Sequence, residues 1–263
     1  MTRIGRLRRR AARRVLASAL LASALAAGCG GGLFGKVYEY EEDAHLSLDG
    51  SADITVNASA AALAALRGLN VSMDPAVILD REAVRSAYQS PVTQVMRVSR
   101  PWRRQGRRFI QIRLHVPDIR KLPQSSPFAW STYELAEKEH LVVFKQTVGP
   151  SALRPGTLPK VGWTGGELVA FRLHLPSKIV YHNSRDLETN QPSAIARGNI
   201  LAWEQALTDR LDGRPVTLEV RMDRQSILHR TLWLFAGAFA AAVLVLAGLV
   251  WWTMRRGRES EAA

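Results

Sequence analysis

Alternating apolar and polar residues dominate the middle of the chain. The segment HLSLDGSADITV alternates on both sides of Asp49 and Gly50, and an Asp-Gly pair between alternating runs is a strong hairpin signal. The same two-residue period recurs in VTQVMRVS, RFIQIRLHV, LVAFRLHL with KIVYHN, NILAWEQAL and PVTLEVRM, and in the apparent hairpin FAWSTYEL–HLVVFKQTV. The pattern predicts about nine strands.

Two segments have helical character instead. ASAAALAALRGL is rich in alanine and leucine and ends at Gly68, a residue type suited to a left-handed helix C-cap. Asp80 is a suitable N-cap for a second short helix that extends to about Tyr88. Residues Pro117–Leu122 are expected to form a single helical turn.

These elements predict an α+β fold: a curved, mostly antiparallel sheet of about nine strands with two short helices. Residues 149–166 are rich in proline and glycine, which is typical of a loop or linker. Because the strands after this segment resemble those before it, we expect one domain, residues 37–222, with an internal loop.

The C-terminal segment Thr231–Trp252 contains 22 residues without a charge, enough to span a bilayer as a helix. Trp233 and Trp251 lie 18 residues apart, about 27 Å along a helix, so each is expected at one membrane interface. Three arginines follow in residues 253–263, which predicts a cytoplasmic tail.

The N-terminus resembles an export signal. Residues 1–14 carry seven arginines and no acidic residue, and thirteen apolar or small residues follow from Val15 to Ala27. That order predicts a signal peptide over residues 1–28, because the apolar run is too short to span a bilayer. Export together with a C-terminal stop places the main domain outside the cytoplasmic membrane, in the periplasm or at the cell exterior.

Cys29 is the single cysteine. The run Ala26-Ala27-Gly28-Cys29 is similar to a bacterial lipobox, in which the thiol receives a diacylglycerol, although leucine is more usual than Ala26. Ordinary signal peptidase cleavage at Ala24-x-Ala26 is the alternative. Residues 29–36 then form a glycine-rich tether. One cysteine excludes an internal disulfide and a cysteine-based zinc cluster.

The net charge of +13 suggests nucleic-acid binding at first. About half of that excess lies on the arginine-rich leader, which says nothing about a folded domain's partner. The predicted export argues further against DNA or RNA as a partner.

Catalytic and metal-binding motifs are not recognisable. There is no G-x-S-x-G elbow, no H-E-x-x-H and no glycine-rich phosphate loop. The six histidines form no pair at helical spacing, and His115 and His174 fit ordinary sheet positions. We therefore expect a protein that is not an enzyme, with no cofactor and no metal site. A hydrolase would require His, Asp and Ser to converge in a cleft.

The most distinctive polar feature is a basic loop over residues 100–108. Arginine binds phosphate through two parallel hydrogen bonds, and tryptophan favours membrane interfaces. The loop is therefore a candidate contact for anionic lipid headgroups, and a solvated hairpin loop is the alternative. The candidate residues are Arg100, Trp102, Arg103, Arg104, Arg107 and Arg108.

Three aromatic residues allow a further hypothesis. Trp130, Tyr133 and Trp163 either line an apolar groove or pack in the core and loops.

The tethers at the two ends limit where the domain can sit. About seven residues separate Cys29 from the first strand near Val37, and about eight separate Met222 from the membrane helix. Each reaches at most about 25–29 Å when extended. If both ends are anchored, we expect both termini of the domain on its membrane-facing side.

FRLHLPSKIVYHN, residues 171–183, combines a strand, a proline-containing break and a His-Asn pair. GNILAWEQAL, residues 198–207, has a glycine-asparagine turn before a strand that contains Trp203. With the leader and the terminal helix, the chain resembles the LppM-type lipoproteins of bacterial envelopes over the second half of its exported part. The resemblance implies a membrane-anchored envelope domain associated with lipid or glycolipid binding, and transfers no binding residue.

The sequence therefore predicts a non-enzymatic envelope domain at the outer face of the cytoplasmic membrane. Its expected partners are membrane lipids, anionic lipid or glycolipid among them. The alternative is an accessory protein-interaction subunit of an envelope complex, with a membrane protein as its partner.

Overall fold

The structure is a computed structural model that describes residues 35–153 and 161–261. The predicted signal peptide, Cys29 and most of the glycine-rich tether lie outside the described residues. Tyr38–Ala263 form one compact unit, which holds all of the fold except the first residue of β1.

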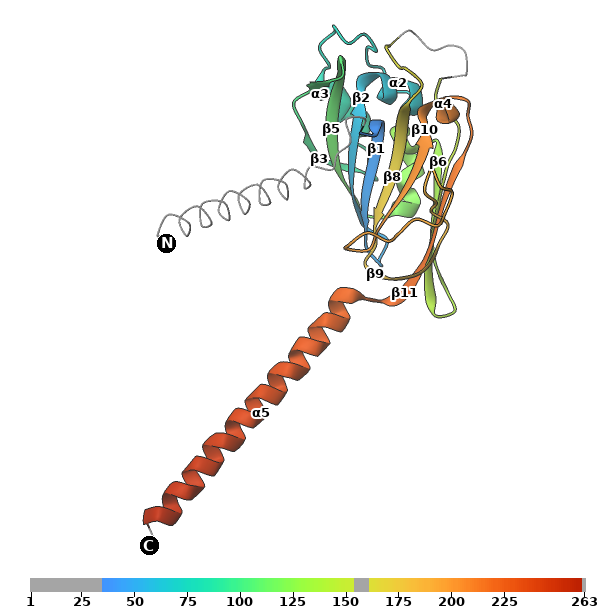
Figure 1. Ribbon diagram of the computed structural model, residues 1–263. Coiled ribbons are helices and arrows are strands. Elements are labelled where there is room, and N and C mark those ends of the chain that lie inside the picture. The colour runs from blue at the N-terminus through green and yellow to red at the C-terminus, as the bar shows by residue number, and fades with distance from the viewer. Residues whose placement is uncertain (1–34, 154–160, 262–263) are drawn as a thin grey trace, which may run out of the picture. The chain divides into compact units, whose positions relative to one another are not determined.

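The larger sheet has seven strands, six of them in the order β10-β8-β1-β2-β5-β3 (Figure 1), and the seventh, β4, also pairs with β5. The strands β3 and β4 follow one another along the edge of β5 that β2 does not occupy. The bounds are β1 Val37–Leu46, β2 Ala52–Ser59, β3 Gln94–Val98, β4 Trp102–Arg104, β5 Arg107–Val116, β8 Glu167–His174 and β10 Ile200–Ala206.

The smaller sheet has four antiparallel strands in the order β6-β7-β11-β9. Their bounds are β6 Ser131–Lys138, β7 Leu141–Val148, β9 Ser177–His182 and β11 Val216–Ser226. Strands from both sides of residues 149–166 pair within each sheet, so the segments before and after that loop build one fold.

The α+β class is confirmed, and the prediction of a single sheet with about nine strands is wrong. The described chain has eleven strands in two sheets. The strand β4 has only three residues, too few to show a two-residue period. The strands β8 and β9 are separated by only two residues, yet they belong to different sheets. The sequence did not reveal this change, because periodicity within one strand contains no information about its partner strand.

The helices follow their local signals. The helix α2 spans Ala60–Arg67; the Ser59 hydroxyl caps its start, and Gly68 ends it with a φ of 69°. The helix α3 spans Arg81–Tyr88, and the Asp80 carboxylate accepts a hydrogen bond from the Glu82 amide at 2.9 Å. Both helices confirm the prediction. The remaining short elements are the 3-10 turns η1 Ile119–Gln124 and η2 Ser126–Phe128, and α4 Leu207–Leu211.

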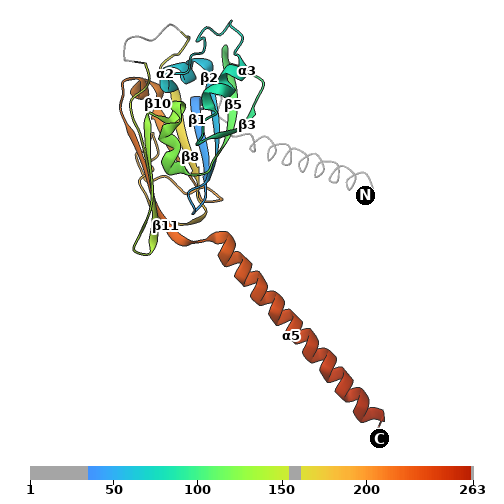
Figure 2. The ribbon, with the colours of Figure 1, turned by 180° about the vertical axis from the view of Figure 1, so that it is seen from behind.

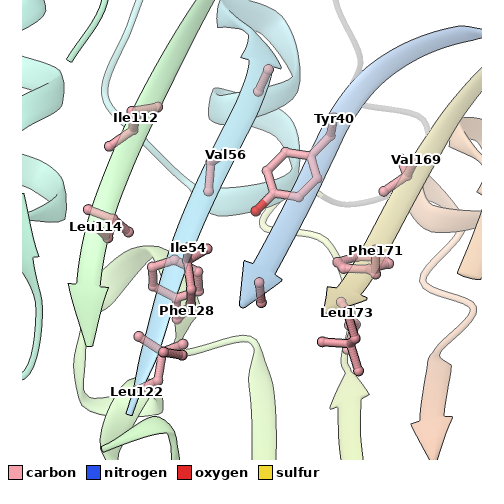
Figure 3. Close-up of a cluster of buried hydrophobic side chains, with 14 of the residues drawn as sticks. Tyr40, Ile54, Val56, Ile112, Leu114, Leu122, Phe128, Val169, Phe171 and Leu173 are labelled. Carbon is pink, nitrogen blue, oxygen red and sulfur yellow. The ribbon is translucent and has the colours of Figure 1, made fainter. Parts of the chain in front are cut away.

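The core lies between the two sheets and is closed at one end by α2 (Figure 2), whose residues are all buried. Figure 3 shows inward-facing side chains from β1, β2, β5 and β8 around Leu122 and Phe128, which the two 3-10 turns insert into the core. Both of these side chains are fully buried. The expected helical turn near Leu122 is thus present, displaced by two residues, and it packs in the core.

A buried ionic network crosses this core. Arg67 donates to the Glu42 carboxylate at 2.7 Å and to the Tyr40 hydroxyl at 2.9 Å. Gln146 donates to the other Glu42 oxygen at 3.1 Å and to the Tyr133 hydroxyl at 3.3 Å. Burial raises the pKa of Tyr40 and of Tyr133 well above the usual range. The space between the sheets is therefore occupied here by polar side chains that satisfy one another.

The chain enters and leaves this fold at opposite ends of its strands. The strands β1 and β8 run in the same direction (Figure 3), and their pairing places Glu41 beside Arg172 and Asp43 beside His174. The strand β11 ends where β9 begins, since Ser226 pairs with Ser177 just after β8. We call the end where β1 starts the entry end and the end where β11 finishes the exit end. The expectation that both termini face the membrane stays a prediction, and with the termini at opposite strand ends it requires strands that lie along the bilayer.

The helix α5 begins directly after β11 and spans Ile227–Glu261. Its segment Thr231–Trp252 has a mean hydropathy of 2.4, and none of its most apolar stretch is buried against the rest of the protein. The segment is long enough to cross a membrane. Trp233 and Trp251 are both largely exposed, as the assignment of this segment to a membrane span requires.

Gly149, just after β7, lies directly against the backbone of Trp130, just before β6. A Cβ built on Gly149 would lie 2.6 Å from the backbone oxygen of Trp130, which also accepts the Gly149 amide at 2.7 Å. We expect Gly149→Ala to lower the free energy of unfolding by about 1–3 kcal/mol, because the backbone must move to admit the methyl group. The measurement is urea unfolding of the full chain in mild detergent, followed by tryptophan fluorescence.

Gly166→Ala is the matched control, because nothing lies within 4 Å of its built Cβ. It should change the unfolding free energy by less than about 0.5 kcal/mol. Equal effects of the two substitutions would contradict the proposed clash.

Candidate functional site

The basic loop forms a tight hairpin at the entry end. The strand β4 pairs with the start of β5, Trp102 with Phe109 and Arg104 with Arg107. Gln105 and Gly106 connect them with φ angles of 50° and 76°, the left-handed pair that a two-residue hairpin turn requires. This geometry places the hairpin at the β3–β4 edge of the larger sheet, where no further strand follows.

The hairpin separates its five arginines into two groups. Arg100, Arg103 and Arg104 are exposed, and Arg108 is half-buried. Arg107 is only 8% exposed; its Nε lies 2.7 Å from the Glu39 carboxylate and its Nη1 donates to the Gly162 carbonyl at 2.8 Å. The expectation that Arg107 lies at the surface with the others is therefore wrong, because β1 supplies its carboxylate partner.

The carboxylates around Arg107 hold a loop against the outer face of the larger sheet. The indole of Trp163 donates to Glu39 at 3.0 Å. Burial raises the pKa of Glu167, but hydrogen bonds from the Thr164 and Gly165 amides outweigh it and leave the pKa below the usual range. Glu167 stays ionised at neutral pH and offsets the Arg107 charge beneath the surface.

The opposite face of the hairpin is braced by the segment before α3. Arg108 donates to the Pro75 carbonyl at 2.9 Å, and Arg103 donates to the same oxygen at 3.3 Å. This bracing holds two large apolar side chains next to the arginines: Val77 is 46% exposed and Ile78 is 80% exposed. An open pocket of about 530 Å³ extends from Ile78 along α3 to Val98.

The exposed arginines and apolar side chains together form a surface that we call the basic edge. Residues 68–114 contain nine arginines and three acidic residues, so the surroundings of this edge are strongly positive. Arginines interleaved with apolar side chains are suited to a ligand that carries both negative charge and hydrocarbon. The exposed members are Arg97, Arg100, Arg103, Arg104, Val77, Ile78, Met96 and Trp102.

The three aromatic residues that suggested a groove do not share one. Tyr133 is buried in the core, where its hydroxyl accepts from Gln146. Trp163 lies on the outer face with Glu39, and Trp130 lies beside Gly68 and Gly149. The packing alternative is confirmed, since the three residues belong to different parts of the fold.

The outer face of the larger sheet carries acid–base pairs that sequence reasoning missed. Glu41 pairs with Arg172 across β1 and β8, and Asp53 lies 2.8 Å from His115 across β2 and β5. His174 lies beside Asp43. The interpretation of His115 and His174 as ordinary sheet positions did not foresee these partners. The alternation of Glu41, Asp43 and His45 marked them as one face of a strand, but the neighbouring strand lies about 130 residues away in sequence.

Comparison with known proteins gives one distant similarity. No protein-family model matches the sequence, and no curated protein matches it. Among solved structures, the NMR structure of the folded domain of LppM from Mycobacterium tuberculosis matches with a TM-score of 0.38 and 12% identity. The match covers 75% of this chain and 97% of that domain. At this level, the similarity does not assign the chain to a family.

Proposed function

We propose that the chain is a non-enzymatic, membrane-tethered domain that lies along the outer face of the cytoplasmic membrane and binds anionic lipid or glycolipid headgroups. The observation that carries the proposal is the basic edge, which places exposed arginines beside exposed apolar side chains at the entry end of the sheet. The membrane helix begins at the exit end. The positions of the entry end and the exit end together limit the orientation in which the domain can contact a bilayer.

The first step concerns the tether. The strand β1 has ten residues, which extend about 30 Å along the sheet. Suppose that the strands stood perpendicular to the bilayer with the exit end at the membrane. Residues 29–36 would then have to span at least the length of β1 for a lipid on Cys29 to enter the bilayer. The eight residues 29–36 reach about 26–29 Å when fully extended. A chain anchored at both ends therefore favours a domain whose strands lie along the membrane.

The second step concerns which side faces the lipid. Two strands, β2 and β5, separate β1 from the β3–β4 edge, which places that edge about 14 Å from β1 at the usual strand spacing. The tether spans this distance with length to spare. The basic edge can then meet the headgroups, where each arginine near an anionic surface contributes about 1 kcal/mol and the exposed apolar side chains enter the interface.

The test uses the full chain in nanodiscs of neutral phosphatidylcholine or of phosphatidylcholine mixed with anionic phosphatidylglycerol. Hydrogen–deuterium exchange of peptides that cover residues 96–108 reports contact of the basic edge. We expect protection in the anionic nanodiscs that decreases with added salt. Arg103→Gln with Arg104→Gln should lower the ratio of membrane-bound to unbound basic edge about 30-fold, which corresponds to about 2 kcal/mol for two arginines.

The matched control is Arg185→Gln with Arg197→Gln. Both residues are exposed, and they lie in the segment between β9 and β10, away from the basic edge. This control removes the same charge and should leave the protection unchanged. Equal protection in neutral and anionic nanodiscs, or equal loss in the control, would contradict headgroup binding by the basic edge.

The alternative is an accessory protein-interaction subunit, for which the unpaired β3–β4 edge would be a docking strand. Purification in mild detergent separates the two functions. Copurifying anionic lipid that is lost with the two arginines supports the first. A stoichiometric protein partner that is retained without them supports the second.

A further inference from the structure

We propose that Asp43, His45 and His174 form a binding site for a divalent transition metal ion, with zinc as the reference ion. Asp43 and His45 lie on the outer face of β1, two residues apart, and His174 ends the neighbouring strand β8. One ligand atom from each residue lies within 4.8 Å of the other two. The sequence predicted no metal site, because this cluster depends on the pairing of β1 with β8.

The ligand atoms are spaced much as they would be around a bound ion, and no hydrogen bond joins them. The Nε2 atoms of His174 and His45 lie 3.0 Å and 3.5 Å from Oδ1 of Asp43. Ligand atoms bound to a tetrahedral zinc at about 2.1 Å are about 3.4 Å apart. The Asp43 oxygen is buried and accepts no hydrogen bond despite these neighbours. The nitrogens thus approach the oxygen without directing an N–H at it.

The two imidazole rings lie side by side at the site. His45 and His174 stack with their centroids 3.8 Å apart and an interplanar angle of 22°. Nearly parallel rings cannot both direct a nitrogen lone pair at one ion, so binding requires one ring to rotate about its side-chain bonds, which the 60% exposure of the His45 side chain permits.

The surrounding charges favour a cation. Asp53 is the cross-strand partner of His45, and its carboxylate lies 2.8 Å from His115. On the other side, the Arg172 guanidinium is engaged by Glu41. Asp43, Asp53 and Glu41 therefore outnumber Arg172 beside the site, while Arg113 lies two strands from Asp43, across Thr55.

The ligand set indicates the class of metal. Two imidazoles and one carboxylate suit zinc and related borderline ions, whereas calcium and magnesium prefer all-oxygen sites. The His45 side chain is 60% exposed, so water can complete the coordination. The site lies at the exit end: His174 is two residues from Pro176, whose carbonyl accepts the amide of Ile227, the first residue of α5. A bound ion would join β1 and β8 next to the connection to the membrane helix.

The test measures zinc binding to the full chain in detergent, purified without a histidine tag and stripped with a chelator. After equilibrium dialysis against zinc chloride, elemental analysis should find one zinc per chain. His45→Asn and His174→Asn should each lower the affinity at least about tenfold, because each removes one of three protein ligands. Asp43→Asn should also weaken binding.

His140→Asn is the matched control, since His140 is an exposed residue in the β6–β7 hairpin, and His115→Asn tests the neighbouring pair. Both should retain zinc. Nitrogen-15 NMR of the histidine side chains in the wild-type chain keeps the test independent of how the variants fold: zinc should shift the Nε2 signals of His45 and His174. The proposal is overturned if these signals do not move, if no zinc binds, or if zinc is lost in His115→Asn or His140→Asn but retained in His174→Asn.

Discussion

Replacing Arg67 with alanine should lower the free energy of unfolding of the folded domain by about 3–5 kcal/mol, the usual effect of removing one partner of a buried ion pair. Arg67 is 3% exposed, and its partner Glu42 is equally buried. The substitution removes the donor for Glu42 and for the Tyr40 hydroxyl, so a carboxylate is left in the core without its countercharge. Urea unfolding of the full chain in mild detergent measures the effect.

Two further variants separate the lost charge pair from lost packing. Arg67→Met with Glu42→Gln removes both charges and retains side chains of similar size, so it should be more stable than Arg67→Ala. Arg120→Ala breaks the surface pair with Asp118 and should have no measurable effect. An Arg67→Ala protein as stable as the Arg120→Ala protein would refute the importance assigned to the buried network.

Phe128→Ala should have an effect of similar size, about 3–5 kcal/mol of unfolding free energy, because it removes a fully buried aromatic ring. The ring packs edge-on against Tyr88 with centroids 5.8 Å apart. It also lies 5.8 Å below the Arg67 guanidinium. Its loss leaves a cavity between α2, α3 and the 3-10 turns, which the same unfolding measurement should detect.

Phe128→Leu is the graded control and should lose less than half as much, because leucine fills most of the space. The double variant Arg67→Ala with Phe128→Ala should lose less than the sum of the single effects, since the two side chains are in contact. Strict additivity would show that the cation and the ring do not interact.

Features set by neighbouring residues could be predicted from the sequence. The hairpin at Gly50, the cap at Gly68 and the helix after Asp80 each depend on residues that are close together in the sequence. Each has its own local energetic preference, for a left-handed backbone or for a capped amide. These local preferences do not depend on the tertiary structure, so the sequence alone predicts them.

Features set by distant pairing could not be predicted. The partition into two sheets depends on β8 joining β1 and β9 joining β11, and alternation only states that a strand has two faces. The same limit affected the candidate site. Arg107 could not be distinguished from Arg103 or Arg104 until β1 placed Glu39 beside it. The histidines likewise required the β1–β8 pairing before they formed a cluster.

The separation of the entry end from the exit end has a mechanical consequence. A pull applied to α5 along the sheet reaches β11 first, which is paired over eight positions with β7 and at four with β9. Because the strands run along the direction of pull, these hydrogen bonds are loaded in shear and must yield together rather than one after another. The domain should therefore resist tension between its two ends far better than a pull across its strands. Single-molecule force spectroscopy in the two geometries would measure that difference as a difference in rupture force.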